Sequence, residues 1–235
     1  MTGTLPKRFW TQAQAVPEAQ GFAVHLDSRP VRTPSKAPLI LPNLPLAEAV
    51  AAEWQAQGER LDPATMPHTR TANTALDKVA ASLDEVVRIV ADYGGSDLLC
   101  YRASHPQELV DAQSAWDAPL DWAAETLGAR LRVTAGVMPV AQDPEALARL
   151  DAEVARLSVF ELTAFHDLVA LSGSLILGLS VAGAVLDPEQ AWRLSRVDEE
   201  FQARLWGSDA EAEAAAESRR QAFHDAAEFL RLCRL

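Results

Sequence analysis

The sequence is poor in cysteine and has fewer basic than acidic residues. Its two cysteines, Cys100 and Cys233, lie far apart among 235 residues and form no CxxC pair. This spacing argues against a disulfide framework and favours a reducing compartment. Lysine and arginine number 21 against 33 aspartates and glutamates, which gives a net charge of −12. Because such a chain repels a phosphate backbone, we expect no nucleic-acid binding.

The short motifs that mark nucleotide binding or nucleophilic hydrolysis are missing as well. The sequence contains no GxxxxGK[ST] loop, no GxGxxG after a strand and no GxSxG elbow. None of its histidines stands at the spacing of a helical metal pair. Neighbouring side chains of a helix point in different directions, so we interpret His166-Asp167 and His224-Asp225 as surface or capping residues and not as catalytic dyads. We therefore expect no cofactor, no metal and no catalytic residue.

The surplus of acid is concentrated in the later part of the chain. Residues 1–100 carry 9 basic and 11 acidic side chains, a net −2, whereas residues 101–235 carry 12 and 22, a net −10. An acidic surface can steer a basic protein partner, or it can serve only to keep the protein in solution. The composition leaves both interpretations open.

One uncharged stretch, residues 168–186, is 19 residues long, which is enough to span a bilayer. Asp167 and Asp187 flank it closely, and no lysine or arginine anchors either end. Ser172-Gly173-Ser174 is typical of a break between two shorter helices. We expect a buried helical hairpin here and keep a membrane-associated helix as the alternative.

Hydrophobic periodicity predicts an α+β fold in two parts. Up to about residue 66 the pattern is that of short strands and turns, and from residue 69 almost everything has the period of a helix. We predict an N-terminal α/β domain with a small, mostly antiparallel sheet, residues 1–80, followed by an all-α helical C-terminal domain, residues 81–235. The strands expected in the first part are residues 9–16, 21–27, 31–33 and 39–41.

The helices follow from apolar stripes and from their end signals. Asn43 is a typical N-cap for a helix over residues 44–57, and Pro144 suits the first position of another helix. Residues 131–133 and 137–140 are predicted to form a short extended pair. The other helices expected are residues 76–93, 106–127, 144–157, 158–172, 174–186, 188–206 and 209–235.

The densest acidic run, Asp198-Glu199-Glu200, lies beside an apolar stripe of the same predicted helix. Three like charges in a row usually mark a solvated helix face. An apolar ridge rimmed by acid and tryptophan is, however, also how protein-recognition surfaces are built. The pattern leaves open whether this ridge binds a partner or belongs to the core. The stripe consists of Val197, Phe201 and Leu205, with Trp192 and Trp206 near its ends.

Several segments, in order along nearly the whole chain, resemble one known family. Residues 194–209 resemble its EE-aromatic-Q…W-G-x-D signature, and residues 26–34 resemble its LDGRPVKTP hairpin, with Ser28 where glycine is usual. On these residues the chain resembles the ATP-twelve chaperones, assembly factor 2 of the F(1)-ATPase. The further matching segments are Lys7-Arg8-Phe9-Trp10, Ala52-Glu53-Trp54 with Gln57, Met66-Pro67-His68-Thr69, Thr74-Ala75-Leu76-Asp77, Asp97-Leu98-Leu99-Cys100-Tyr101-Arg102 and Trp116-Asp117.

The resemblance implies a chaperone that uses no ATP, performs no catalysis and holds no cofactor. Its client would be the unassembled alpha subunit of the F(1)-ATPase, which it keeps from aggregating before the catalytic head of ATP synthase assembles. The acid known to matter in the family maps to Glu199 or Glu200, and the sequence does not decide between them. The partner-binding residues expected from this run are Asp198, Glu199, Glu200, Phe201, Gln202 and Trp206.

The same resemblance favours a bacterial homologue in the cytoplasm, whose eukaryotic relatives work in the mitochondrial matrix. The first ten residues have the character of neither a secretory signal nor a mitochondrial presequence. We expect a monomer when free, without stable membrane insertion. Two other classes stay open from the residues alone. One is a small acidic hydrolase-type enzyme, and the other is a membrane-associated helical protein that uses residues 168–186.

Overall fold

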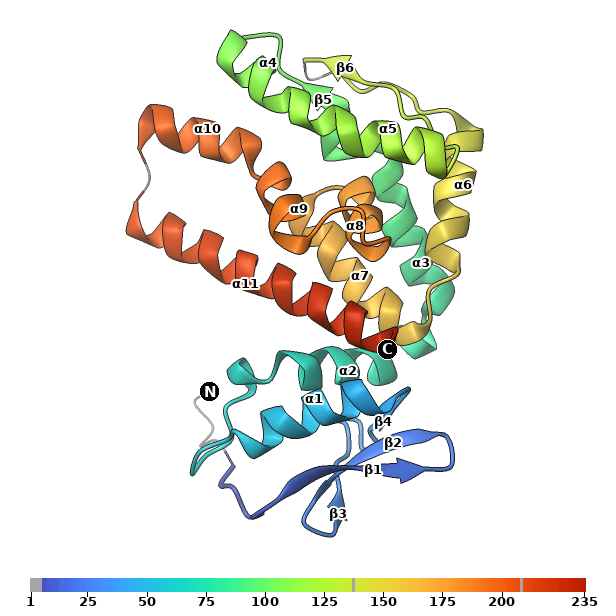
Figure 1. The fold of residues 1–235 in the computed structure, drawn as a ribbon, viewed down its shortest axis with the longest axis vertical. Helices are drawn as coiled ribbons and strands as arrows, with labels where there is room; N and C mark the ends of the chain where they lie inside the picture. Colours follow the sequence, from blue (N-terminus) through green and yellow to red (C-terminus); the bar gives the residue numbers. More distant parts are fainter. Residues whose placement is uncertain (1–5, 137, 208) are drawn as a thin grey trace. The chain divides into compact units, whose positions relative to one another are not determined.

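The computed structural model describes residues 6–136, 138–207 and 209–235 (Figure 1). The chain forms two compact units: the first consists of residues up to 83 with 159–164 and 228–235, and the second of 84–158 and 165–227. The predicted fold class, with a small antiparallel sheet near the N-terminus and helices after it, is confirmed. The predicted domain boundary at residue 80 stays a prediction.

The elements are mostly helical after the first four strands. The strands are β1 (Ala13–Glu18), β2 (Gly21–Leu26), β3 (Arg29–Pro30), β4 (Ile40–Leu41), β5 (Tyr101–Arg102) and β6 (Thr134–Ala135). The helices are α1 (Leu44–Gln55), α2 (Pro67–Asp77), α3 (Leu83–Ala91), α4 (Gln107–Gln113), α5 (Asp117–Thr126), α6 (Pro144–Ala155), α7 (Val159–Ser172), α8 (Leu175–Ala182), α9 (Pro188–Ser195), α10 (Val197–Trp206) and α11 (Ala210–Cys233). Short 3₁₀ turns cover Pro63–Thr65, Val79–Ala81, Asp92–Gly95, Leu98–Cys100 and Ser114–Trp116.

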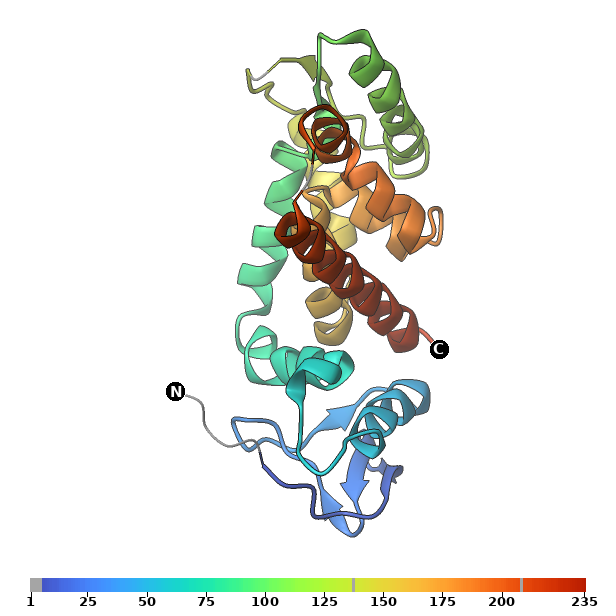
Figure 2. The ribbon, with the colours of Figure 1, turned by 90° about the vertical axis from the view of Figure 1, so that its left-hand side faces the viewer.

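The sheet of the first unit is antiparallel throughout. Its order is β1-β2-β3, and β4 pairs with β2 as well, so that β2 is the central strand. Helix α1 covers one face of this sheet and packs on β1 and β2 (Figure 1, Figure 2). Gly21 opens β2 with φ +143°, and a Cβ there would clash with the carbonyl oxygen of Leu41. Glycine is therefore required at the point where β4 approaches β2.

The hairpin turn after β2 does not need the glycine that Ser28 replaces. The left-handed residue of this turn is Asp27, with φ +54°, and aspartate adopts that conformation more readily than most residues do. The Asp27 carboxylate accepts hydrogen bonds from the backbone N–H groups of Thr11, at 3.1 Å, and Gln12, at 2.9 Å. The returning strand is β3, so the predicted strand over residues 31–33 is wrong. In that segment Arg32 forms an isolated bridge with Pro38.

Asn43 caps α1 as predicted and also serves a second helix. Its Oδ1 accepts a hydrogen bond from the backbone N–H of Leu46 at 3.0 Å. Its Nδ2 donates to the carbonyl oxygens of Leu232, at 2.8 Å, and Cys233, at 3.0 Å, at the end of α11. One side chain therefore satisfies a backbone donor where one helix begins and two acceptors where another ends.

Glu53 of α1 supplies the cap that α2 does not provide for itself. Met66, which precedes α2, has no side chain that can accept a hydrogen bond from the first turn. The Glu53 carboxylate accepts from the backbone N–H groups of His68, at 2.6 Å, and Thr69, at 2.8 Å, and from the Thr69 hydroxyl at 2.6 Å. A negative charge at a helix N-terminus is favourable, so this contact fixes α2 against α1.

Three of the predicted helices are interrupted in the structure. The stripe over residues 76–93 spans the end of α2, a 3₁₀ turn and α3, and the predicted helix 188–206 is broken at Arg196. A 3₁₀ turn divides the predicted helix 106–127, so that Pro119 lies in the first turn of α5. Proline is tolerated there because the first N–H groups of a helix have no partner within it.

The predicted extended pair of residues 131–133 and 137–140 is wrong for the part that the structure describes. Residues 131–133 and 138–140 form no strand, and residue 137 lies outside the described residues. Strand β6 lies between the two segments and pairs in parallel with β5, with Tyr101 opposite Thr134. The partner strand is thus some thirty residues earlier in the chain, where a local pattern could not reveal it.

The uncharged stretch 168–186 divides into α7 and α8 at Gly173, as predicted. Gly173 has φ +71°. Ser174 caps α8 and donates its hydroxyl to the carboxylate of Asp97 at 2.8 Å. That fully buried carboxylate also accepts the backbone N–H groups of Leu99 and Ile176, both at 3.0 Å. Burial raises the pKa of Asp97 to about 6, against the lowering effect of these hydrogen bonds. Among the described residues, no helix is long and apolar enough to cross a membrane.

Replacing Asp97 with asparagine is expected to destabilise the protein by about 1–3 kcal/mol at neutral pH. The asparagine side chain would place an NH2 group where one carboxylate oxygen now accepts. One of the buried groups that donate to Asp97 would therefore lose its acceptor. Urea unfolding of the two proteins measures the difference. An asparagine variant of unchanged stability would show that the buried hydrogen bonds of this carboxylate contribute nothing.

The same two proteins test the pKa of Asp97. Because the folded-state pKa lies above the ordinary 3.8, at about 6, the folded protein holds this proton more tightly than the unfolded chain does. The contribution of Asp97 to stability therefore falls as the pH rises through this interval. The unmodified chain is expected to gain stability relative to Asp97→Asn on acidification across it, whereas parallel pH profiles would contradict the raised pKa.

Candidate functional site

All six residues predicted to bind a partner lie in α10, where they face different surroundings. Asp198 faces inward, and its Oδ1 accepts a hydrogen bond from Nε2 of Gln113 in α4 at 2.6 Å. Gln113 is buried, and its Oε1 accepts the backbone N–H of Ala103 at 2.7 Å. Asp198 therefore fastens α10 to α4.

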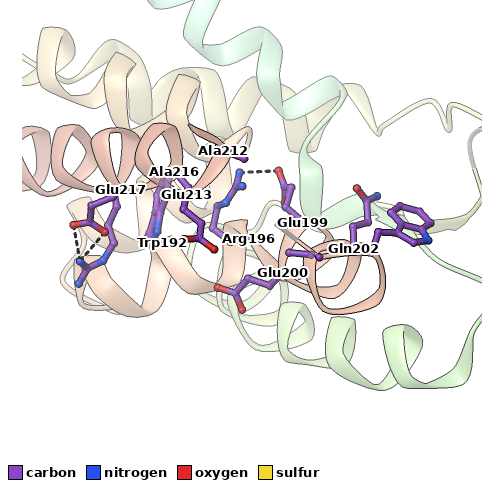
Figure 3. Close-up of a pocket in the computed structure, with 13 residues that line it drawn as sticks. Trp192, Arg196, Glu199, Glu200, Gln202, Ala212, Glu213, Ala216 and Glu217 are labelled. Carbon is purple, nitrogen blue, oxygen red and sulfur yellow. Dashed lines mark hydrogen bonds and ion pairs between the residues drawn. The ribbon is translucent and has the colours of Figure 1, made fainter. Parts of the chain in front are cut away.

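The two glutamates that follow differ in their partners. Glu199 forms an ion pair with Arg196 at 2.8 Å, and the Arg196 guanidinium lies over the ring of the buried Trp192, 5.6 Å from its centroid. The Glu200 carboxylate, by contrast, forms no hydrogen bond or ion pair with any residue that the structure describes. Figure 3 shows it apart from the bonded pair of Arg196 and Glu199. Glu200 is thus the acid of this run that keeps its charge available to another molecule.

The predicted apolar stripe divides along α10. Phe201 is 7% exposed and belongs to the core, whereas Leu205 is 58% and Trp206 is 78% exposed. Gln202, between these groups, is exposed as well. The stripe is therefore core in its first half and an exposed apolar surface at the end of the helix. Such large exposed side chains are typical of interaction sites when they cluster.

Helix α11 is fixed to α9 by a cluster of charges around Glu189. The Glu189 carboxylate is bonded to Arg193 of its own helix at 3.0 Å and to Arg220 and His224 of α11 at 2.8 Å and 3.0 Å. Hydrogen bonding from Arg220, supported by His224 and Arg193, lowers the pKa of Glu189 to about 2. These contacts set the distance between α9 and α11.

An open groove of about 510 Å³ lies between α10 and α11. In Figure 1, α10 runs outward from α9 and α11 returns below it. Acidic side chains outnumber basic ones in this groove by four to two, and its apolar part comes from tryptophan and alanine. We call it the α10–α11 groove, and its lining residues are Trp192, Arg196, Glu199, Glu200, Gln202, Ala203, Trp206, Gly207, Ala212, Glu213, Ala216, Glu217 and Arg220.

The lining of the groove consists of acidic, basic, amide and apolar side chains. Its lining contains no histidine and no cysteine, and no group of His, Cys, Asp or Glu in the described part of the chain could hold a metal ion. Asp97, whose pKa is raised, is enclosed by backbone donors and does not line the groove. Glu189, whose pKa is lowered, is bonded to Arg220 of the groove but is not itself one of the lining residues.

The two histidine–aspartate neighbours behave differently. The argument that adjacent side chains cannot meet is wrong for His166, whose Nδ1 lies 3.1 Å from Oδ1 of Asp167. This contact raises the pKa of His166, which is half-buried, and Asp167 is exposed. His224 contacts Glu189 and not its neighbour Asp225.

Comparison with known proteins identifies the family of this chain. The sequence profile of the ATP12 chaperone protein family matches residues 7–124. The crystal structure of Atp12 from Paracoccus denitrificans has 54% sequence identity and a TM-score of 0.94, covering 97% of this chain and 98% of its own. The chain belongs to the ATP12 chaperone family. A point mutant of Paracoccus Atp12p, with lysine in place of an aspartate, matches at 53% identity and a TM-score of 0.94, covering 97% of each chain. A candidate chaperone from Agrobacterium tumefaciens matches at 39% identity and a TM-score of 0.93, covering 97% of this chain and 86% of its own.

The motifs that carried the resemblance to the ATP12 family contact one another in pairs. Glu53 caps the helix that begins in the Met66-Pro67-His68-Thr69 segment. Arg102 likewise donates to the carbonyl oxygens of Leu99, at 2.8 Å, and Gln113, at 2.6 Å, and pairs with Asp117 at 2.9 Å. These segments therefore hold helices together, whereas Glu200 and Trp206 of the α10 motif point to solvent.

The α11 wall of the groove was not predicted. Residues 210–217 are rich in alanine and glutamate, which is the composition of an exposed helix. Nothing in this composition indicates that Ala212, Glu213 and Ala216 face α10, because the facing depends on the contact of Glu189 with Arg220, 31 residues later.

Replacing Glu189 with glutamine is expected to destabilise the packing of α11 in a way that depends on pH. Because the folded-state pKa is lowered from 4.5 to about 2, the stabilisation is present above 4.5 and is lost as the pH falls toward about 2. The difference in unfolding free energy between the unmodified chain and Glu189→Gln should therefore be constant near neutrality and shrink on acidification. Glu211→Gln, at an exposed position of α11, is the matched control. A difference that does not change with pH would contradict the role given to Glu189.

Proposed function

We propose that this chain is a chaperone of ATP synthase assembly, which binds the unassembled alpha subunit of the F(1)-ATPase and prevents its aggregation. The observation that carries the proposal is the acid of Glu200, without a partner among the described residues, on the same helix as the exposed Trp206. Membership of the ATP12 chaperone family supports a protein client. In this function the chain uses no ATP, cofactor or catalytic residue.

The exposed end of α10 suits the task of covering part of an unassembled subunit. A subunit outside its complex exposes an apolar interface that otherwise aggregates. Leu205 and Trp206 offer apolar area to cover part of that interface, and tryptophan is a frequent centre of binding energy in protein interfaces. An acid beside it adds charge complementarity, which speeds association and selects partners more than it strengthens the complex.

The six residues of the predicted site then divide into two groups. Asp198 accepts a hydrogen bond from Gln113 and Phe201 lies in the core, so that both hold α10 in place. Glu200, Gln202 and Trp206 are exposed in the groove lining and make the contact with the client. Glu199 forms an ion pair with Arg196, so Glu200 is the acid of the run that contacts the client.

The setting of the protein is proposed from its relatives. The similar structures from Paracoccus and Agrobacterium support a bacterial chaperone that works in the cytoplasm on newly made subunits. We place it there as a monomer when free, binding neither nucleic acid nor membrane.

Charge reversal at the two glutamates tests the proposal. Glu200→Lys is expected to weaken capture of the alpha subunit by about tenfold, because it places a positive charge where the client finds a negative one. Glu199→Lys should weaken capture less, because the charge of Glu199 is already neutralised by its ion pair with Arg196. The measurement is co-purification of the co-expressed alpha subunit, followed by titration of the purified pair.

Glu211→Lys changes the net charge equally but lies outside the groove, so it should capture the client normally. Thermal unfolding checks that each variant is folded. Normal capture by both Glu199→Lys and Glu200→Lys would remove this surface from the proposed function, and failure of the unmodified chain to retain the alpha subunit would remove the function itself.

A further inference from the structure

We infer that a second surface, on the first unit, binds a carboxylate-bearing segment of the client through Phe9 and Arg29. We call it the Phe9–Arg29 surface. The inference rests on the proposed function and adds a contact that lies within the first unit and shares no residue with the α10–α11 groove. It is carried by an exposed ring held in place, by a guanidinium without a carboxylate partner, and by the distribution of charge along the chain.

Phe9 is an exposed aromatic side chain whose position is fixed by its neighbours. It is 62% exposed, although its ring meets the buried Trp10 edge to face, with 5.2 Å between the centroids. The Arg29 guanidinium lies over the Phe9 ring, 5.4 Å from its centroid. A ring that is packed on a buried neighbour and still open to solvent loses little conformational freedom when a partner covers it. Phe9 therefore has the properties of an anchor in a protein interface.

The backbone that carries Phe9 is fastened by the residue before it. The Arg8 guanidinium donates to the carbonyl oxygens of Trp10, at 3.0 Å, and of Gln57, just beyond α1, at 2.6 Å. The backbone N–H of Arg8 donates to the carbonyl oxygen of Glu59 at 2.9 Å. Both the main chain and the side chain of Arg8 thus hold this segment beside the end of α1. Because the segment is already ordered, a partner that binds Phe9 does not have to order it.

Arg29 is the cation of this surface, and it has no acid to pair with. Its guanidinium forms no hydrogen bond or ion pair with any residue that the structure describes. The nearest acid along the chain, Asp27, accepts the backbone N–H groups of Thr11 and Gln12 instead. The planar guanidinium presents a fork of N–H donors that matches a carboxylate, and it can do so while it lies over a ring. Arg29 can therefore bind a carboxylate of the partner that covers Phe9.

The distribution of charge favours an acidic segment on this part of the chain. Residues 1–83 carry 8 basic and 7 acidic side chains, a net +1, whereas residues 84–235 carry 13 and 26, a net −13. An acidic segment meets the least repulsion on the first part, whereas a basic segment gains more on the second. Four of the seven acids of the first part also accept hydrogen bonds from backbone N–H groups, namely Asp27, Glu53, Asp62 and Asp77.

The size of the surface selects a polypeptide segment over a larger polyanion. One guanidinium and one phenyl ring match one carboxylate with an apolar side chain beside it. Protein interfaces combine an apolar centre with a polar rim, so an unassembled subunit offers such pairs. A nucleic acid or an anionic membrane would also approach the rest of the chain, whose net charge of −12 repels it. The client of the proposed function is therefore the occupant that fits.

Substitutions at the two residues test the inference. Phe9→Ala and Arg29→Glu are each expected to weaken binding of the purified alpha subunit by about tenfold, because one removes the anchor and the other reverses the charge. Arg29→Lys should fall between Arg29→Glu and the unmodified chain, because the ammonium keeps the charge but not the planar fork. Titration measures the affinities, and thermal unfolding checks that each variant is folded.

Arg70→Glu is the matched control for charge. It changes the net charge as Arg29→Glu does, at an exposed position of α2, and should bind the client normally. Unchanged affinity of both Phe9→Ala and Arg29→Glu would overturn the inference. An equal loss in Arg70→Glu and Arg29→Glu would overturn it as well, because the effect would then come from net charge alone.

A photo-crosslinking derivative of phenylalanine at position 9 identifies the occupant directly. It is expected to link to a client segment that contains an aspartate or glutamate, read out by mass spectrometry. The same residue at Glu48, an exposed position of α1, should give little product. Lysine in place of the linked client carboxylate should then restore binding to Arg29→Glu. A linked segment without a carboxylate, a link to a second copy of this chain, or failure of the charge exchange would overturn the inference.

The two levels of the proposal fail in different ways. If the unmodified chain does not retain the alpha subunit, the proposed function is wrong and the inference falls with it. If Glu200→Lys weakens capture but Phe9→Ala and Arg29→Glu do not, the client binds without the Phe9–Arg29 surface, and only the second contact is overturned.

Discussion

Buried helix ends must have their backbone polar groups satisfied, and in this protein side chains from distant segments do so. Asn43 serves the start of α1 and the end of α11, Glu53 serves the start of α2, and Asp97 serves the start of α8. The contacts of Asn43 with the end of α11 and of Asp97 with the start of α8 join segments far apart in the sequence, and Glu53 joins α1 to the next helix. The positions of the helices therefore depend on a few polar side chains as much as on apolar packing.

The same principle decides which side chains are free for function. An acid that accepts buried hydrogen bonds, such as Asp97, or that fastens a helix, such as Asp198, cannot attract a partner without loosening the fold. Asp198 holds α10, and Trp116 holds the preceding α9 by donating its indole N–H to the carbonyl oxygen of Leu194 at 2.8 Å. With both helices held, Glu200 and Trp206 are left facing solvent. The candidate site consists of the side chains of α10 that make no structural contact.

This division explains what the sequence could and could not predict. The Asn43 cap and the break at Gly173 have local signals, a cap residue before an apolar run and a glycine in a serine-flanked turn, and both predictions are confirmed. The interruption between α2 and α3 was missed because the 3₁₀ turn keeps an apolar residue, Val79, in the stripe. The pairing of β6 with β5 and the facing of α11 toward α10 were beyond reach, because each depends on a contact between residues remote in sequence.

A chaperone without an energy source must bind strongly enough to protect its client and weakly enough to lose it. The proposed contact meets both demands through its size. An open groove of about 510 Å³ takes a few side chains of the client. A stable interface between subunits buries at least about 1,200 Å² of surface. In the proposed function the native partner of the client forms such an interface, and mass action favours transfer as that partner accumulates. Because surface charge acts mainly on the rate of association, the acid of Glu200 can make capture fast without making release slow.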